Sequence, residues 1–295
     1  MKFGHVETDQ LGNLDLQLPE DSPNNKSLLG GKRSDKVSVY IGCAKWGRKE
    51  WVGLIYPEGT KATDFLANYV NHFNGIEVNA TFYNAKKSSM ESWAKIPTGD
   101  FKFCAKFPQR ISHIKRLKES EESTSWFFDS VATFGPYLGL PFLQMPDNFA
   151  PKYFDRLKDY IEASKGKIPY AVELRHPDWF SDSQVFEDTS RLLEENNVTF
   201  VITDTAGRRD CVHQRLTTRS AFIRFNGYEL HTTDNSRMDE WAEKIREWID
   251  IGLEEVYFFL HQQEEKNTIL SAEYMVKKIN EVCGMNLVAP KFLNR

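Results

Sequence analysis

Polar side chains near the end of one short apolar run give the first indication of chemistry in this 295-residue chain. In IEVNATFY, residues 76–83, the β-branched Ile76 and Val78 alternate with Glu77 and Asn79, as in a strand. Successive strand side chains point to opposite faces, so Glu77 and Asn79 share a face. An acid at the end of a strand that is covered on both sides is unfavourable unless it is paired or used. Glu77 is therefore either half of a buried ion pair or an active-site acid.

Six further runs repeat this arrangement, with a polar side chain close to the C-terminal end and in phase with residues that are mainly apolar. The polar residues are Lys106, Gln144, Glu173 with Arg175, Asp204, Arg224 with Asn226, and His261. Asp204 enters the set because it is in phase with Ile202. The carboxyl ends of parallel strands meet on one side, which in a barrel is where catalysis occurs. We expect a functional mouth there, and the alternative is a purely structural network of buried salt bridges.

The residue types favour general acid–base chemistry on a small anionic or sugar-like metabolite. The catalytic groups that we expect are the lysine and the carboxylates of the set, Glu77, Lys106, Glu173 and Asp204. Charges that are confined together shift one another's pKa, which is how proton-transfer groups are tuned. Glu173 or Glu77 would be the general acid or base, with Lys106 as its partner. Hydrolase, lyase and isomerase chemistry fit equally well, and the substrate is left open.

Substrate-binding residues are expected on the same strand ends and on the loops that follow them. They are Trp46, Asn79, Tyr83, Gln144, Arg175, His176, Trp179, Arg224, Asn226 and His261. Guanidinium groups suit carboxylates and phosphates, so Arg175 and Arg224 would hold an anionic part of the substrate. Asn79, Gln144 and Asp204 would orient it. The tryptophans and the tyrosine would stack on a sugar or a base, or would simply cover the core.

Two basic loops keep a nucleic-acid-binding or -processing barrel open as an alternative. They follow the third and sixth expected strands and carry Arg110, His113, Lys115 and Arg116, and Arg208, Arg209, His213 and Arg215. Such bases contact phosphates or are simply solvated. A non-catalytic ligand-binding barrel is a third possibility, because a fold does not imply a function. We expect no cofactor, although the carboxylates and a histidine leave a divalent metal possible, which the neighbouring cations oppose.

Alternation and helical spacing predict eight strands separated mostly by helices. The expected strands are residues 37–42, 76–83, 101–106, 140–145, 170–175, 198–203, 221–225 and 256–260. A capping box at Ser88 and Glu91 predicts the start of one helix. This rhythm predicts a single (β/α)₈ TIM barrel whose crossover between strands six and seven, residues 204–220, is degenerate. An open doubly wound sheet is the alternative, but no GxGxxG follows the first strand.

The first 36 residues are polar, and we expect an arm over residues 1–36, partly disordered or surface-packed, followed by a barrel domain over 37–295. LDLQLP at 14–19 could add a short edge strand. The net charge of −4 argues against a general polyanion binder. The four cysteines are dispersed without metal spacing, and no apolar run reaches membrane-spanning length. We therefore expect a cytoplasmic protein without membrane contact, of open oligomeric state.

Seven motifs occur in order along the chain: IGCAKW (41–46), IEVNATFY (76–83), FKFCAKFPQRISH (101–113), PFLQMP (141–146), AVELRHPDW (171–179), VITDTAG (201–207) and AFIRFNG (221–227). They resemble the YecE-like family, a TIM-barrel domain of unknown function, over about residues 37–283. The resemblance implies the barrel fold and no particular reaction. The typical residues of the family correspond here to Trp46, Glu77, Asn79, Tyr83, Lys106, Gln144, Glu173, Arg175, His176, Trp179, Asp204, Arg224 and Gly227.

Two motifs depart from the pattern of the family. Cys43-Ala44-Lys45-Trp46 replaces the small and hydroxyl residues that usually precede Gly-Trp. His261-Gln262-Gln263 stands where the last strand usually ends in an Asn pair. The first loop therefore differs, and the role of His261 is left open.

Overall fold

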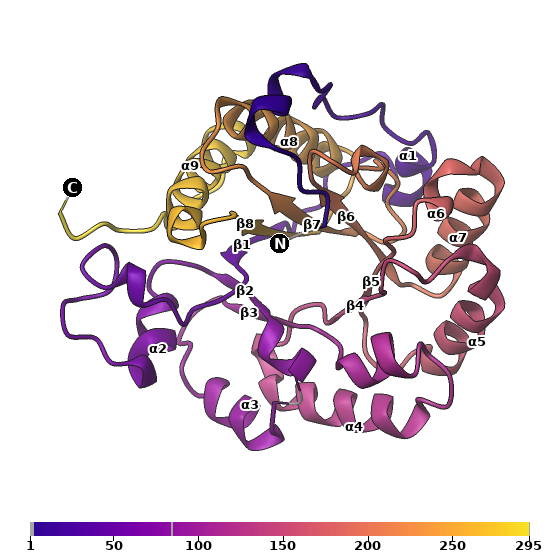
Figure 1. Cartoon of the computed structure of the whole chain (residues 1–295), viewed down its shortest axis with the longest axis horizontal. Helices are drawn as coiled ribbons and strands as arrows, with labels where there is room; N and C mark the ends of the chain where they lie inside the picture. The colour runs from indigo at the N-terminus through magenta and orange to yellow at the C-terminus, as the bar shows by residue number, and fades with distance from the viewer. Residues whose placement is uncertain (1–2, 84, 295) are drawn as a thin grey trace.

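Eight parallel strands form one sheet in the computed structural model, which describes residues 3–83 and 85–294. The strands are β1 Ser38–Cys43, β2 Gly75–Val78, β3 Lys102–Ala105, β4 Phe142–Gln144, β5 Ala171–Glu173, β6 Thr199–Asp204, β7 Ser220–Asn226 and β8 Glu255–His261. Their order is β3-β2-β1-β8-β7-β6-β5-β4. Bridges from Phe103 to Leu138 and from Lys106 to Phe142 join the two ends, so the sheet is nearly closed (Figure 1). The predicted (β/α)₈ barrel is confirmed.

Helices surround the outside of the sheet (Figure 1). The α-helices are α1 Asn24–Leu29, α2 Phe65–Tyr69, α3 Lys87–Trp93, α4 Glu121–Val131, α5 Phe154–Ser164, α6 Asp178–Ser181, α7 Ser183–Glu195, α8 Thr232–Asp250 and α9 Thr268–Cys283. The capping box predicted at Ser88 is wrong, because α3 begins one residue earlier and no side chain among the described residues caps it. Between β6 and β7 the chain forms only the short 3₁₀ turn Arg209–Cys211, as the degenerate crossover predicts.

The strands separate two apolar regions. The barrel interior is filled by Tyr40, Cys104, Leu140, Phe142, Ala171, Val201, Phe222, Tyr257 and Phe259. The alternate residues of the same strands, such as Ile202 and Ile223, belong to the core between sheet and helices. Strand-end residues in the inner phase lie above the filled interior, at the mouth. Membership of the inner phase therefore decides which of the expected residues face a site.

The N-terminal arm begins at the carboxyl end of the barrel and runs along its outside to the start of β1. Residues Thr8–Asn13 form a 3₁₀ helix, and Leu11 and Leu16 are buried with Ala206 and Tyr228. No strand forms over residues 14–19, so the expected edge strand is wrong. Figure 1 shows the start of the arm reaching the middle of the barrel in this view. Within the described ranges, no helix is long and apolar enough to cross a membrane.

Candidate functional site at the barrel mouth

Two buried carboxylates share one arginine at the carboxyl end of the barrel. Glu77 of β2 and Glu173 of β5 both lie in the inner phase and are almost fully buried. Arg224 of β7 lies between them, and its Nε and Nη2 donate to Glu77 at 2.9 and 2.8 Å. Its Nη1 donates to Glu173 at 2.8 Å. Such paired guanidinium–carboxylate bonds fix both the distance and the orientation of the two acids.

Residues from the ends of β2 and β8 complete the bonding of Glu77. The strand β2 ends at Val78, and Asn79–Tyr83 turns into a 3₁₀ helix, which is shorter than the strand predicted over 76–83. The turn brings the Asn79 amide back to donate to Glu77 Oε1 at 2.8 Å. His261 Nε2 lies 3.2 Å from Glu77 Oε2. Both carboxylate oxygens of Glu77 are therefore occupied.

Residues from β4, the end of β5 and β6 complete the bonding of Glu173. Arg175 Nε and Thr203 Oγ1 donate to its Oε1 at 2.8 and 3.2 Å. The Gln144 amide nitrogen donates to its Oε2 at 2.7 Å, and this orients the Gln144 carbonyl oxygen toward Lys106 Nζ, also at 2.7 Å. We call the following residues the inner network: Glu77, Asn79, Lys106, Gln144, Glu173, Arg175, Thr203, Arg224 and His261.

The arginines hold both acids in the ionised form. Burial would raise the pKa of Glu173, but Arg175, Arg224 and the hydrogen bond from Gln144 lower it to about 2. Burial acts on Glu77 in the same way, and Arg224 and His261 hold its pKa well below the ordinary value. An acid so strongly held in its anionic form is a poor proton acceptor at neutral pH. This environment disfavours Glu77 and Glu173 as the general acid or base and makes them electrostatic supports.

Whereas the two acids are held in their charged form, the surroundings of Lys106 disfavour its charged form. Its half-buried side chain leaves the end of β3 with Nζ 4.4 Å from the centre of the Phe82 ring. Among the described residues, its hydrogen-bond acceptor is the neutral amide of Gln144 rather than a carboxylate. Burial and the nearby Arg224 lower the pKa of Lys106 to about 8, although Glu77 and other acids raise it in part. Lys106 can therefore give and take a proton near neutral pH.

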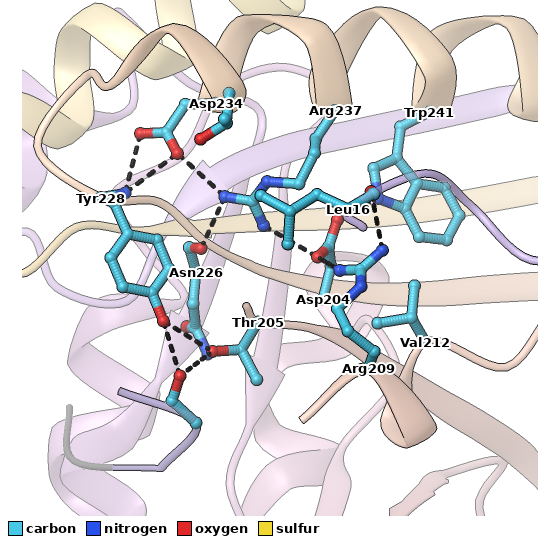
Figure 2. Close-up of polar contacts among 12 residues, drawn as sticks. Leu16, Asp204, Thr205, Arg209, Val212, Asn226, Tyr228, Asp234, Arg237 and Trp241 are labelled. Carbon is cyan, nitrogen blue, oxygen red and sulfur yellow. Dashed lines mark hydrogen bonds and ion pairs between the residues drawn. The ribbon is translucent and has the colours of Figure 1, made fainter. Parts of the chain in front are cut away.

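Asp204 does not reach the mouth, which corrects the expected site. It lies in the outward phase of β6, and its side chain is fully buried beneath α8. It accepts hydrogen bonds from Arg209 at 2.5 Å, Arg237 at 2.8 Å and Trp241 Nε1 at 2.8 Å (Figure 2). Thr203, one residue earlier, takes the inward position that had been assigned to Asp204. Both phases of β6 end in a polar residue, so the sequence alone does not show which of the two faces the mouth.

Asp204 belongs instead to a second buried cluster, between β6 and α8. Arg237 of α8 also donates to Asp234 at 2.9 Å and to the Asn226 backbone carbonyl at 3.0 Å (Figure 2). Burial would raise the pKa of Asp204, but Arg237 and Arg209 lower it. We call this cluster the outer network: Asp204, Arg209, Asp234, Arg237 and Trp241.

The aromatic residues expected at the mouth separate into three environments. Trp179 is fully buried and donates its indole N–H to the Phe149 carbonyl, so it belongs to the core rather than to a substrate site. Trp46 is half-buried and packs edge-on against Trp93. Tyr83 is 72% exposed, beside the turn that carries Asn79. The indole of Trp179 is therefore removed from the expected binding surface.

Two further polar residues of the expected set, one half-buried and one buried, lie outside the inner network. His176 is half-buried and accepts from the backbone N–H of Asp178 at 3.2 Å. Asn226, at the end of β7, has neither amide atom bonded within the described part of the chain. It lines a cavity of 20 Å³ together with His261 and His5, which is about the size of one water molecule. No group of three or more His, Cys, Asp or Glu residues in the described ranges is arranged to hold a metal ion.

The start of the N-terminal arm lies against the mouth, which the sequence did not predict. The Phe3 ring lies 4.3 Å from the Arg175 guanidinium. The Gly4 carbonyl accepts from the Tyr228 hydroxyl at 2.6 Å and from the Gly207 backbone N–H at 2.9 Å. We call residues 3–5 the arm tip. Neither spacing nor composition signals such a contact, because it joins residues more than 150 positions apart.

Known proteins resemble the chain in sequence and in structure. It is 30% identical over 242 residues to the protein YecE of Escherichia coli (strain K12), a match that spans 76% of this chain and 86% of the relative. It is 32% identical over 151 residues to YunF of Bacillus subtilis (strain 168), spanning 48% of this chain and 52% of the relative.

Two solved structures share the fold. A DUF72 family protein from Enterococcus faecalis V583 matches with a TM-score of 0.65 at 16% identity, covering 87% of this chain and 100% of that one. A DUF72 family protein from Thermotoga maritima MSB8 matches with a TM-score of 0.61 at 22% identity, covering 84% and 100%. At these identities the likeness supports the fold alone.

The sequence model described as "Protein of unknown function DUF72" matches residues 40–291. This range contains the whole inner network and leaves out the N-terminal arm. The resemblance inferred from the seven motifs is confirmed. The chain belongs to the YecE-like family of barrel proteins, which the description DUF72 denotes.

Proposed function

We propose that this protein is an enzyme that moves protons on a small anionic or sugar-like metabolite at the barrel mouth, with Lys106 as the proton carrier. One observation carries the proposal: Lys106 Nζ is held by the neutral Gln144 amide while the adjacent acids are bound by arginines. Its pKa of about 8 suits both halves of a proton transfer near neutral pH. Lyase, isomerase and hydrolase reactions all use such a step.

The charge of the inner network supports an anionic substrate. Within this network three cations, Lys106, Arg175 and Arg224, face the two acids Glu77 and Glu173, so one positive charge is in excess while Lys106 is protonated. The exposed Asp147, outside the network, lies 4.0 Å from Arg175 Nη1. Arg224 is 1% exposed, and each of its three nitrogens donates to an acid, so it positions the acids rather than gripping a ligand. Arg175, nearer the surface, is the guanidinium that we assign to an anionic group of the substrate.

The test is a screen of phosphorylated and carboxylated metabolites for turnover, followed by Lys106→Met and Lys106→Arg. We expect either substitution to lower kcat by at least about 10²-fold, the usual contribution of a positioned acid or base. The pH profile should show an ionisation near pH 8. Lys102→Met is the matched control, because Lys102 lies on the same strand but its exposed Nζ binds the Pro136 carbonyl instead.

Two outcomes would contradict the proposal. Full activity of Lys106→Met would remove Lys106 as the proton carrier. Saturable binding of a metabolite without turnover would favour the non-catalytic ligand-binding barrel.

Nucleic-acid binding is a second candidate, favoured by one surface feature. A cleft of 380 Å³ between the start of α3, the loop after β3 and α4 is lined by Lys86, Arg110, Trp126 and one acid, Glu122, and Trp126 is 44% exposed. Cations beside an exposed aromatic side chain suit a single strand. The second basic loop does not add to it, because Arg209 binds Asp204 inside the protein. Binding to single-stranded oligonucleotides should weaken steeply with salt, and salt-insensitive or absent binding would exclude this candidate.

A further inference from the structure

We infer that Lys106 is also a nucleophile, and that the substrate class of this mouth is an aldehyde or ketone bearing an anionic group, which Lys106 binds as an imine. This inference rests on the proposed function, because it concerns the same amine and the same site. A lysine amine must meet three conditions to do this chemistry: it must lose its proton, stay exposed to a small molecule, and tolerate the cation that forms.

The first condition concerns the neutral amine. An ammonium group is stabilised by a carboxylate, but the two acids next to Lys106 are committed to arginines, Glu77 to Arg224 and Glu173 to Arg224 and Arg175. The Gln144 oxygen that accepts from Nζ carries no charge. Burial and two neighbouring guanidinium groups favour loss of the proton, which is the situation of lysines that form imines.

The second condition concerns position and access. Lys106 directly follows β3 in the inner phase, at the end of the barrel where substrates bind. Its side chain is half-buried rather than enclosed. The Phe82 ring covers one side of Nζ at 4.4 Å and the Gln144 amide fixes another, so the amine is held in a defined direction. A fixed amine loses less entropy on attack than a solvated one.

The third condition concerns charge balance. The neutral amine attacks the carbonyl carbon, and one of its two protons passes from nitrogen to the carbonyl oxygen to give a carbinolamine. This intermediate expels its hydroxyl group, which leaves as water with one proton from solvent, and nitrogen keeps its single remaining proton as a protonated imine. The product carries one positive charge at the place of the former ammonium. Glu77 and Glu173 therefore face one positive charge on the Lys106 nitrogen in both states, the ammonium group and the protonated imine.

The experiment uses pyridoxal 5′-phosphate, an aldehyde with an anionic group, on the intact protein. After incubation at pH 7.5 and reduction with sodium borohydride, the label on each lysine is measured by peptide mass spectrometry. We expect at least about tenfold more label on Lys106 than on Lys102, since a lowered pKa leaves roughly a tenth or more of the Lys106 amine neutral. Pyridoxal, which lacks the phosphate, should label Lys106 several-fold less. Equal labelling by both aldehydes would overturn the anionic part of the inference.

Competitive acetylation across pH 6–11 distinguishes failure of this inference from failure of the proposed function. A Lys106 midpoint near pH 8 together with borohydride-stable label supports both. The same midpoint without aldehyde label overturns the imine and leaves the proton carrier in place. A midpoint above pH 10 overturns both, because no neutral amine would then be available near neutral pH. These measurements need no substitution in the protein, so they do not depend on the folding of a variant.

Discussion

Two buried networks at the carboxyl ends of the strands contain the same unit, an arginine that bridges two carboxylates, but they differ in what this unit supports. In the inner network Arg224 joins Glu77 and Glu173, and in the outer network Arg237 joins Asp204 and Asp234. Each arginine is 1% exposed and each bridges two acids. An arginine between two carboxylates is therefore no sign of a functional site by itself.

The difference lies in what else each network contains. The outer network is closed by the indole N–H of Trp241 and by Arg209, so its two acids face two guanidinium groups. The inner network adds Lys106, a third cation beside two acids that already face two arginines. The side chain of Lys106 is half-buried. A charge-balanced network stabilises the fold, whereas an unbalanced one leaves a group whose protonation can change.

Removal of the central arginine should give the largest effect and should separate the two networks. Arg224→Met and Arg237→Met each leave two buried acids without their shared partner, and we expect each to lower the free energy of unfolding by about 3–5 kcal/mol. Of these two substitutions, only Arg224→Met should raise the pKa of Lys106, because Arg224 and Arg175 are the guanidinium groups that lower it. Urea unfolding and Lys106 acetylation against pH measure the two quantities.

Glu243→Ala is the control for α8, because Glu243 forms an exposed ion pair with Arg246. This substitution should change the free energy of unfolding by less than about 0.5 kcal/mol. If Arg237→Met shifted the pKa of Lys106 as much as Arg224→Met did, the two networks would be one electrostatic unit and the comparison would fail.

Acid should weaken the inner network next most strongly. Because the pKa of Glu173 is about 2 in the folded protein, the unfolded chain binds more protons between that pH and the ordinary value near 4.5. Its contribution is therefore complete above pH 5 and is lost as the pH falls toward 2, by roughly 3 kcal/mol in total. Glu173→Gln should flatten the dependence of unfolding free energy on pH over this window. An unchanged slope in this variant would show that Glu173 is not held ionised.

Strand periodicity explains why most of the inner network could be predicted. A period of two assigns each strand residue to a face, and parallel strands end on one side, so Glu77, Lys106, Gln144, Glu173 and Arg224 were placed together without any knowledge of their contacts. The helices and barrel followed from the same alternation of strand and helix patterns.

Periodicity could not decide phase where both phases carry a polar residue. In β6 the neighbours Thr203 and Asp204 both end the strand, and only the contact of Asp204 with Trp241 of α8 shows which one faces outward. Strand periodicity also could not show which of the clustered groups are protonated. Glu173 was expected to be a general acid or base with Lys106 as its partner, but Arg175 and Arg224 hold Glu173 in its ionised form, whereas burial and Arg224 lower the pKa of Lys106; both effects are tertiary properties.

Replacement of Lys106 should change stability in the opposite direction from the arginines. Its pKa of about 8 in the folded protein lies below the ordinary value of 10.5, so the folded state binds this proton more weakly than the unfolded chain does. The protonated amine therefore lowers the free energy of unfolding, with its full effect below pH 8. Lys106→Met should therefore stabilise the protein by about 1–2 kcal/mol at pH 7, after loss of the Gln144 hydrogen bond is allowed for. The gain should shrink as the pH rises from 8 through 10.5, because the wild-type amine is neutral in both states only above that range. Thermal unfolding at pH 7 and 10 tests this, and destabilisation at pH 7 would indicate an ion pair.

The smallest effect should come from the arm, which contacts both networks. Phe3 lies over Arg175 of the inner network, while the backbone carbonyl of Leu16 accepts from Arg209 of the outer one. Gly4 has φ of +66°, and an added Cβ would collide with the Thr205 side chain, so Gly4→Ala should release the arm tip. The tip can detach without unfolding the barrel, which limits the loss to about 1 kcal/mol.

Hydrogen exchange and arginine modification can show whether the arm tip detaches alone. They distinguish the contact of the tip with the inner network from the contact of Leu16 and Gln17 with Arg209. In Gly4→Ala the amide of Gly207, which donates to the Gly4 carbonyl, should exchange faster, and phenylglyoxal should modify Arg175 faster. Arg209 should keep its wild-type reactivity, because its contacts with the Leu16 and Gln17 carbonyls do not involve the tip. Gly12→Ala is the matched control, since an added Cβ there meets open space. Faster modification of Arg209 together with Arg175 would mean that the arm leaves as one piece and that its hold on the outer network depends on the inner one.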